Sequence, residues 1–150
     1  MQTEKTLIGR REKIDFPELK LSGIIAKIDT GAYTTALHCD EILEKNGVLY
    51  FTPLGSLDDG YKGEQHRVTD YEQKEIRNSF GEVEKRYIIK TTITIGRKRI
   101  KALISLTNRG KMRYPVLIGR KLLKNRFVVD VSLLEALTKK IIIRKKKNNS

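Results

Sequence analysis

Strict alternation of apolar and polar residues is the feature that most constrains what this chain can fold into. It is clearest around residues 86–95, where one set of alternate positions is mostly apolar and the other is mostly polar. Tyr87, Ile89, Thr91, Ile93 and Ile95 make up the first set, and Arg86, Lys90, Thr92 and Thr94 belong to the second. Because successive side chains of a strand point to opposite faces, the pattern predicts a β-strand.

The alternation resumes beyond a turn and predicts a hairpin. Gly96-Arg97-Lys98 follows the first strand, and Ile100, Ala102, Ile104 and Leu106 alternate after it. A second hairpin is predicted just upstream. Its strands run from Arg67 to Arg77 and from Val83 onward, joined by Asn78-Ser79-Phe80-Gly81.

Further short strands are predicted elsewhere, with little helix. The strand candidates are Leu7 to Arg10, Ile24 to Asp29, Thr35 to Cys39 and Val48 to Thr52. Leu54 to Gly63 has the composition of a surface loop. A short helix is expected over Arg120 to Asn125, and Ser132 is a candidate cap for another over Leu133 to Leu137. Many short strands favour a mostly β fold, either a closed barrel or a sandwich.

The chain is strongly basic, and part of the charge is concentrated at its end. The formal net charge of the 150 residues is +13. Six cations without an acid beside them are Lys139, Lys140, Arg144, Lys145, Lys146 and Lys147. We therefore expect one domain over residues 1–138 and a basic tail over 139–150. A positive field of this kind attracts polyanions such as nucleic acid, ribosome surface or acidic peptide, whereas the tail alone is equally typical of a solvated end.

The single cysteine and the short apolar stretches indicate the cellular compartment of the protein. Cys39 is the only cysteine, so no intrachain disulfide can form, which favours a reducing environment. No apolar run follows Met1, and stretches such as Ile141-Ile142-Ile143 are too short to cross a bilayer. These features predict a cytoplasmic protein without a membrane segment.

One tripeptide could carry chemistry, namely Asp29-Thr30-Gly31. It follows the apolar strand Ile24 to Ile28 and precedes Ala32. A strand that delivers a carboxylate to a tight turn suits catalysis, with Gly31 allowing close backbone approach and Thr30 bracing the turn by a local hydrogen bond. The same residues also occur in ordinary turns, so the tripeptide alone leaves both interpretations open.

A second segment makes the resemblance specific. Pro115-Val116-Leu117-Ile118-Gly119-Arg120-Lys121-Leu122-Leu123, together with Asp29-Thr30-Gly31-Ala32, resembles the signature of retropepsin-like aspartic proteases. The resemblance implies a closed retropepsin-like β-barrel with one short C-terminal helix. It also implies that the apolar-apolar-Gly strand passes under the catalytic turn, and that Arg120 braces the subunit.

A closer resemblance covers most of the chain, from Leu7 to about Phe127. The matching motifs are Ile8-Gly9-Arg10-Arg11-Glu12, Ala26 to Ala32 with Ala36-Leu37-His38, Ser105 to Arg109, and Met112 to Pro115. They are similar to a bacterial and archaeal family named as ATP-dependent zinc proteases, which has a retropepsin-like fold. Its members often occur with, or fused to, ligases that add glutamates to a ribosomal protein.

The resemblance implies an aspartic peptidase whose dyad is shared by two chains. Two carboxylates about 3 Å apart share one proton and activate water. With one Asp-Thr-Gly, the second Asp29 must come from another copy in a homodimer, and Asp130 is interpreted as a strand-end acid. The predicted catalytic residues are Asp29, Thr30 and Gly31. The predicted substrate-binding residues are Ala32, the flap residues Ser79 and Phe80, and Arg109 and Arg113.

An acidic substrate is the expected partner. Arg67, Arg86, Arg109 and Arg113 could line a cleft for carboxylates, since the guanidinium fork matches a carboxylate with two bonds. The net charge suits such a glutamate-rich substrate, and the ligases associated with the resembled family imply cleavage of glutamate-rich tails of a ribosomal or other acidic protein.

No cofactor and no metal are predicted, despite the family name. The sequence lacks a P-loop and a His-Glu-x-x-His motif. His38, His66 and Cys39 are the only candidate zinc ligands, and neighbouring strand residues point to opposite faces. Cys39 with His66 could form a nucleophilic pair, but a buried strand cysteine is the simpler interpretation.

Two non-enzymatic alternatives remain. A basic β-barrel could bind RNA or the ribosome through phosphate contacts, although aromatic residues, at 7% with no Trp, are sparse for base stacking. An inactive retropepsin-like domain could serve as a dimerisation scaffold, against which the intact Asp29-Thr30-Gly31 argues.

Overall fold

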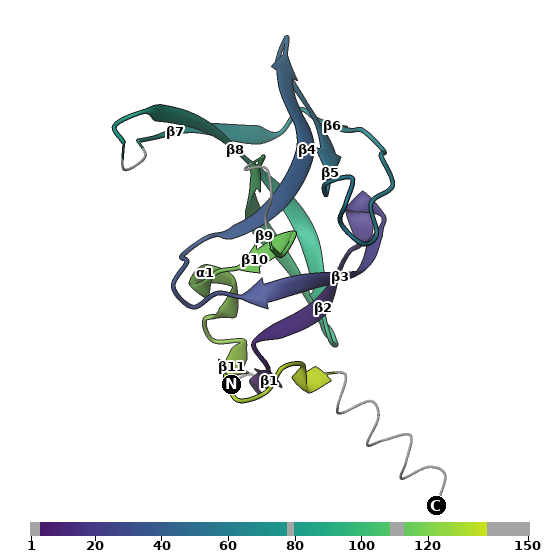
Figure 1. Ribbon diagram of the computed structural model, residues 1–150, viewed down its shortest axis with the longest axis vertical. Helices are drawn as coiled ribbons and strands as arrows, with labels where there is room; N and C mark the ends of the chain where they lie inside the picture. Colours follow the sequence, from purple (N-terminus) through teal and green to yellow (C-terminus); the bar gives the residue numbers. More distant parts are fainter. Residues whose placement is uncertain (1–3, 78–79, 109–112, 138–150) are drawn as a thin grey trace, which may run out of the picture.

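A computed structural model of the chain describes residues 4–77, 80–108 and 113–137 (Figure 1). The elements in chain order are β1 (Thr6–Ile8), β2 (Arg11–Phe16), the 3-10 helix η1 (Pro17–Leu19), β3 (Leu21–Ile28), β4 (Thr35–Lys45), β5 (Val48–Pro53), β6 (His66–Val68), β7 (Tyr71–Arg77), β8 (Val83–Ile95), β9 (Lys98–Thr107), β10 (Val116–Ile118), α1 (Arg120–Leu123) and β11 (Phe127–Val129). The expected mostly β class is therefore confirmed.

Six strands close into a barrel. The hydrogen-bonded order β10-β3-β2-β8-β9-β4 returns to its start because β10 pairs with both β3 and β4. The pairings β3–β10 and β4–β9 are parallel, whereas β2–β3 and β8–β9 are antiparallel. Closure leaves these six strands without a free edge. Period-two alternation left both a barrel and a sandwich open, and the structure has the barrel that the retropepsin resemblance implies.

The barrel interior is filled by the apolar positions of the alternating strands. Among its fully buried side chains are Phe16, Phe51, Ile14, Ile24, Leu37, Ile93, Ile95, Ile104 and Ile118. The period-two pattern sends these side chains to one side of the sheet and the polar residues between them to the other. Burial of this apolar surface is the main favourable contribution to folding.

Both predicted hairpins form. Gly96, with a φ of +59°, and Arg97 make the two-residue turn between β8 and β9, where Ile95 pairs with Lys98. β7 pairs with the first half of β8 up to the Arg77–Val83 pair, and this hairpin projects from the barrel at the upper left of Figure 1. The upstream arm is shorter than predicted, because residues 66–68 form the separate strand β6, which pairs with β5.

The strand β2 was not predicted, and its pattern explains why. Its inward positions are Glu12, Ile14 and Phe16, all fully or almost fully buried. A glutamate at an inward position interrupts the apolar alternation that marks a half-buried strand. The Glu12 carboxylate accepts hydrogen bonds from the backbone N–H groups of Gly9 (2.7 Å), Ala136 (2.8 Å) and Leu137 (3.3 Å).

The segment after β11 differs from the prediction. Ser132 does not cap a helix over 133–137, because its N–H and hydroxyl both bond to the Asp130 carboxylate, at 2.9 and 2.6 Å. Residues 131–134 form turns and bends, and helical geometry begins only at Ala136. The carbonyls of Leu133 and Leu134 bond to the N-terminal segment instead, where they accept the N–H groups of Arg10 and Arg11. The basic tail predicted over 139–150 lies outside the described residues.

No helix in the described part of the chain is long and apolar enough to span a bilayer.

Candidate active site at the Asp29 turn

The turn that carries Asp29 is held by the neighbouring strand. The Asp29 N–H donates to the Ile118 carbonyl of β10 at 2.9 Å, which extends the β3–β10 pairing by one residue. The Asp29 carbonyl then accepts the Ala32 N–H at 3.1 Å and closes the turn. The carboxylate Oδ1 accepts the Gly31 N–H at 3.1 Å. The Asp29 side chain is half-buried, and no described residue donates a hydrogen bond to its other oxygen.

Helix α1 fixes the same turn from the other side. The N–H groups of Arg120 and Lys121 donate to the carbonyls of Ala32 and Tyr33, at 2.8 and 3.0 Å. The Arg120 guanidinium donates to the Thr30 carbonyl at 3.0 Å and lies over the Tyr33 ring. The expected arrangement, in which the Leu117-Ile118-Gly119 segment passes beneath the turn and Arg120 braces it, is present in the structure.

Gly119 is required where this strand meets the turn. A Cβ built there would lie 2.6 Å from the Thr34 carbonyl oxygen and 2.7 Å from that of Tyr33. Its N–H donates to the buried Thr35 hydroxyl at 3.1 Å. The β10–α1 junction therefore fits against residues 33–35 only without a side chain at position 119.

Two details of the turn differ from the sequence-based description. Gly31 was expected to allow a close approach of backbone. A Cβ at this position would instead meet only the Asp29 Oδ1, at 3.3 Å, so the missing side chain leaves room for the carboxylate. Thr30 was expected to brace the turn through its hydroxyl. Within the described residues the Thr30 hydroxyl has no hydrogen-bond partner, and the Thr30 carbonyl takes that role by accepting Arg120.

One outer face of the barrel continues from Asp29 across neighbouring strands. Leu117 pairs with Lys27, two residues before Asp29, and also with Ala36. Ala36 in turn pairs with Ser105 of β9. Directly paired residues point to the same side of a sheet, as do residues two apart on one strand. Asp29, Leu117, Ala36 and Ser105 therefore share one face.

This face extends onto β8 and holds two unsatisfied polar atoms. Ile88 pairs with Ser105, and Arg86 lies two residues before Ile88 on the same side. The hydroxyl of Ser105, a residue that is 6% exposed, and the Nε of Arg86 are buried without a hydrogen-bond partner. Leaving a buried polar group unpaired costs about 1–3 kcal/mol. The two atoms are enclosed by protein, so a ligand would pair with them only where neighbouring side chains move, and such pairing would recover that cost.

Arg86 was a predicted cleft residue, whereas Ser105 was quoted only as part of a matching motif. The signal that could have identified it is a small polar residue between Ile104 and Leu106, both buried in the barrel. A serine at that point of a strand faces the opposite side from the core.

The predicted flap is the β7–β8 hairpin. Phe80 lies at its tip and is 88% exposed, and Gly81 follows with a φ of +81°. Ser79 lies outside the described residues. At the base of the hairpin, the Tyr71 ring packs edge-on against Tyr87, and its hydroxyl donates to Glu44 at 2.5 Å. The hydrogen bond to Glu44 raises the pKa of Tyr71 to about 12.

The remaining predicted substrate residues have different surroundings. Ala32 is half-buried and is part of the braced turn. Arg113 is exposed, with its guanidinium 5.8 Å from the centre of the Tyr114 ring. Arg109 lies outside the described residues. Arg67 is exposed on β6, where it pairs with Tyr50 of β5.

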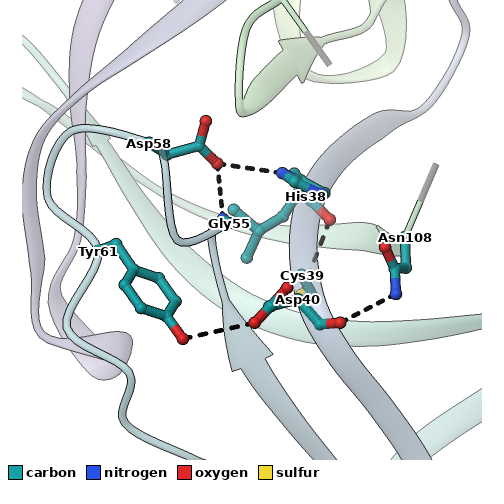
Figure 2. A network of polar contacts seen from close by, with 8 residues as sticks. His38, Cys39, Asp40, Gly55, Asp58, Tyr61 and Asn108 are labelled. Carbon is teal, nitrogen blue, oxygen red and sulfur yellow. Dashed lines mark hydrogen bonds and ion pairs between the residues drawn. The ribbon is translucent and has the colours of Figure 1, made fainter. Parts of the chain in front are cut away.

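The candidate zinc ligands do not form one cluster. His38 pairs with the carboxylate of Asp58 at 3.0 Å, and that carboxylate also accepts the Gly55 N–H, as Figure 2 shows. His66 stacks on Phe51. Within the described residues, no group of three His, Cys, Asp or Glu side chains is placed to hold a metal.

Cys39 is a buried thiol. It is fully buried, and this burial raises the pKa of the Cys39 thiol far above its usual value. A thiol that stays protonated is a poor nucleophile. The interpretation as a buried strand cysteine is thus the one that the structure supports.

The polar contacts of His38 belong to a network that docks the Leu54–Gly63 loop onto β4 (Figure 2). Besides the His38–Asp58 pair, the Tyr61 hydroxyl donates to the Asp40 carboxylate at 3.4 Å. The Asn108 side chain donates to the Asp40 carbonyl at 2.9 Å. The loop predicted from composition is present, and the His38–Asp58 and Tyr61–Asp40 contacts hold it against β4.

Asp130 is a strand-end acid, as interpreted from the sequence. It follows β11, and its carboxylate is taken up by the Ser132 hydroxyl and N–H. These two hydrogen bonds lower the pKa of Asp130 below its usual value. Asp130 is thus engaged in a local turn.

The chain belongs to the RimB-like family, described as retropepsin-like aspartic endopeptidase RimB, whose profile matches residues 7–140. This is the class of protein that the closed barrel, the Asp29 turn and the Gly119 junction define. The ATP and zinc of the family name in the sequence-based resemblance receive no support from this match.

Two curated relatives share about a third of its residues. A Shewanella halifaxensis protein named "Probable alpha-L-glutamate ligase" is 32% identical over 138 residues, which cover 88% of this chain and 30% of the relative. A Desulfotalea psychrophila protein of the same name is 31% identical over 139 residues, covering 89% and 30%. The chain thus spans about a third of the length of these relatives.

A solved structure has the same fold. The crystal structure of a Legionella pneumophila protein of unknown function, from the DUF785 family, superposes with a TM-score of 0.65 at 27% identity. The match covers 87% of this chain and 96% of that one.

Proposed function

We propose that the chain is an aspartic peptidase whose active site forms when two copies bring their Asp29 turns together. The observation that carries this proposal is the state of the Asp29 carboxylate. One oxygen is oriented by the Gly31 N–H, and within the described residues the other has no donor. The side chain is half-buried on a turn fixed from both sides by β10 and α1. Such a carboxylate is rigidly placed, and one of its oxygens is available to water or to a second carboxyl group.

The dyad would hydrolyse a peptide bond by moving protons between two carboxyl groups. The ionised Asp29 takes a proton from a water molecule as the water oxygen bonds to the scissile carbonyl carbon. The protonated Asp29 of the second copy donates its proton to the carbonyl oxygen. When the tetrahedral intermediate collapses, the C–N bond breaks. The carboxyl group that took the water proton passes it to the leaving nitrogen, and the other, now ionised, carboxylate takes back one hydroxyl proton from the intermediate. Orientation of Asp29 by Gly31 and Arg120 holds the reacting groups in position.

The β7–β8 hairpin is suited to close over the bound peptide. It projects from the barrel (Figure 1) and carries the exposed Phe80 at its tip. Closure of such an element excludes water other than the attacking molecule and holds the scissile bond. We assign Phe80 a substrate contact, together with its neighbour Ser79.

We propose acidic peptides as substrates, including glutamate-rich tails of a ribosomal or other protein. Arg86 and Ser105 offer unsatisfied donors on the face that begins at Asp29, and Arg113 and Arg109 would add cationic contacts. A guanidinium binds a carboxylate with paired, charge-assisted hydrogen bonds. The net charge of +13 supports the same choice of substrate, and so do relatives whose name includes L-glutamate ligation.

We propose a reducing compartment, such as the cytoplasm, as the place of action. Cys39 is a buried free thiol, which suits such a compartment.

The test compares the unchanged protein with Asp29→Asn, using Asp130→Asn as the matched control. A glutamate-rich and a glutamine-rich peptide are incubated with each protein from acid to neutral pH, and products are read by mass. We expect Asp29→Asn to lose at least about 10²–10⁴-fold in turnover while it still binds the glutamate-rich peptide, and Asp130→Asn to keep activity. Equal cleavage by both variants would refute the role of Asp29. Cleavage that prefers the glutamine-rich peptide would keep the peptidase and remove the acidic substrate.

Sedimentation equilibrium tests the dimer in the same preparations. We expect a reversible dimer whose dissociation lowers the specific activity on dilution, because each copy supplies one carboxylate. Specific activity that does not change on dilution of a monomeric protein would contradict the shared dyad.

A further inference from the structure

A basic groove lies beside α1. It is an open hollow of about 500 Å³ between the start of β9 and the segment from α1 to β11. Its lining residues are Lys98, Arg99, Ile100, Lys121, Lys124, Asn125 and Arg126. Five of the seven are cations and none is acidic. The volume lies within the range of about 300–1,000 Å³ that is typical of ligand sites.

The cations of this groove are not neutralised by the protein. Lys98 is held by uncharged groups, since its amine donates to the Glu4 carbonyl at 3.1 Å and lies over the Phe127 ring. Arg126 donates to the Leu122 carbonyl at 3.1 Å. In the part of the chain that the structure describes, the side chains of Arg99, Lys121 and Lys124 form no ion pair and no hydrogen bond. The five positive charges therefore repel one another, and a bound anion would relieve this repulsion.

The groove and the Asp29 turn share one rigid element. Lys121 of α1 and Lys124, the residue after its end, both line the groove. The backbone of Arg120 and Lys121 is bonded to Ala32 and Tyr33 of the turn. A helix rises about 1.5 Å per residue and an extended peptide about 3.3 Å per residue. A polypeptide held at Asp29 therefore needs only a short further length to reach the groove.

We propose that this groove is a second binding site for the carboxylates of an acidic polypeptide, outside the part held at Asp29. The inference rests on the proposed peptidase function for its choice of ligand. The groove offers no exposed aromatic ring, because Phe127 is only 7% exposed and its ring already contacts Lys98. Single-stranded nucleic acid is usually held by base stacking on such rings. Flexible Lys and Arg side chains without a stacking surface match a run of glutamates better.

Direct binding to the 150-residue chain carrying Asp29→Asn tests the proposal without cleavage. The probe is a fluorescein-labelled peptide of ten glutamates, followed by anisotropy at fixed salt. The test variant is Lys121→Gln with Lys124→Gln, and the matched control is Lys13→Gln with Lys45→Gln, which removes the same charge from exposed positions on β2 and β4. Arg99→Gln is a second test variant on a different element.

We expect the test pair to weaken binding at least about fivefold relative to the control pair, and Arg99→Gln to weaken it as well. Thermal melts establish that the variants fold. Equal affinities for test and control pairs, or no binding of the probe to the parent, would overturn the proposal. A groove-dependent affinity for labelled oligouridylate greater than that for the peptide would also overturn it. The proposed peptidase function fails in a different experiment, namely if Asp29→Asn retains cleavage in the activity assay. The binding measurement does not depend on that result.

Discussion

Asp29 and Glu12 are two carboxylates near the same end of the antiparallel strands β2 and β3, and their surroundings differ completely. Glu12 is fully buried and accepts three backbone N–H groups, from Gly9, Ala136 and Leu137. Asp29 is half-buried and accepts one N–H, from Gly31. A buried charge must be satisfied by hydrogen bonds, and full burial keeps a carboxylate from contact with water or substrate. The first carboxylate stabilises the fold, and the second is available for chemistry.

The largest expected effect separates the two carboxylates by stability. Glu12→Ala leaves two buried N–H groups and one partly buried N–H group without an acceptor, and each buried group costs about 1–3 kcal/mol. We expect urea denaturation to show a loss of about 4 kcal/mol or more for Glu12→Ala, and about 2 kcal/mol for Glu12→Gln, which keeps one acceptor oxygen. Asp29→Asn should change the free energy of unfolding by less than about 1 kcal/mol while it abolishes turnover.

The distinction between a structural Glu12 and a chemically available Asp29 would be contradicted if Asp29→Asn were as destabilising as Glu12→Ala. It would also collapse if Glu12→Gln removed activity at temperatures where the variant stays folded.

The next effect concerns the junction that holds the Asp29 turn. Gly119→Ala forces a Cβ to within 2.6 Å of the Thr34 carbonyl oxygen, so β10 and α1 must shift against the turn. We expect a loss of about 1–3 kcal/mol in stability and a fall in kcat, because the turn bonds to both elements. Gly47→Ala is the control. Gly47 has a φ of +76° but open space around it, so its replacement should lower stability by about 1 kcal/mol without a change in kcat.

Much of the fold could be predicted from the sequence, because period two marks strands that have one face in the core. β3, β4, β5, β8 and β9 were found in this way, although β4 continues to Lys45, well beyond the predicted end at Cys39. The missed strand β2 carries Glu12 at an inward position, and its acceptor role depends on Ala136 and Leu137, far away in the chain. No local pattern contains that information.

The candidate site was found in part for the same reason. The Asp29 turn and the Gly119 junction are encoded by contiguous motifs, so the resemblance located both. The face with Arg86 and Ser105 arises from the register between β4, β8 and β9, which periodicity cannot set. The helix expected after Ser132 failed because the Asp130 carboxylate captures both Ser132 donors, a competition between a turn and a helix cap that the sequence leaves open.

A smaller effect tests the polar face beside Asp29. Arg86→Gln removes the guanidinium whose Nε is unpaired, and we expect KM for glutamate-rich peptides to rise about tenfold with little change in kcat. KM for a glutamine-rich peptide should change much less. Ser105→Ala should follow the same trend to a lesser degree. If both variants raised KM equally for the two peptides, Arg86 would shape the cleft without recognising carboxylates.

The smallest expected effect lies at the base of the flap and is read through pH. The hydrogen bond to Glu44 raises the pKa of Tyr71 to about 12, above its usual value of 10.0. A folded-state pKa above the unfolded value means that the protonated phenol is favoured by folding. Its contribution to stability is therefore complete below pH 10 and is lost as pH rises through about 12.

We expect the melting temperature of the unchanged protein to exceed that of Tyr71→Phe at pH 8 to 9, and the difference to vanish by pH 12. Glu44→Gln should reduce this pH dependence, because it removes the charge that opposes ionisation of the phenol. A difference that stayed constant from pH 8 to 12 would show that Tyr71 supports the hairpin by ring packing on Tyr87 alone.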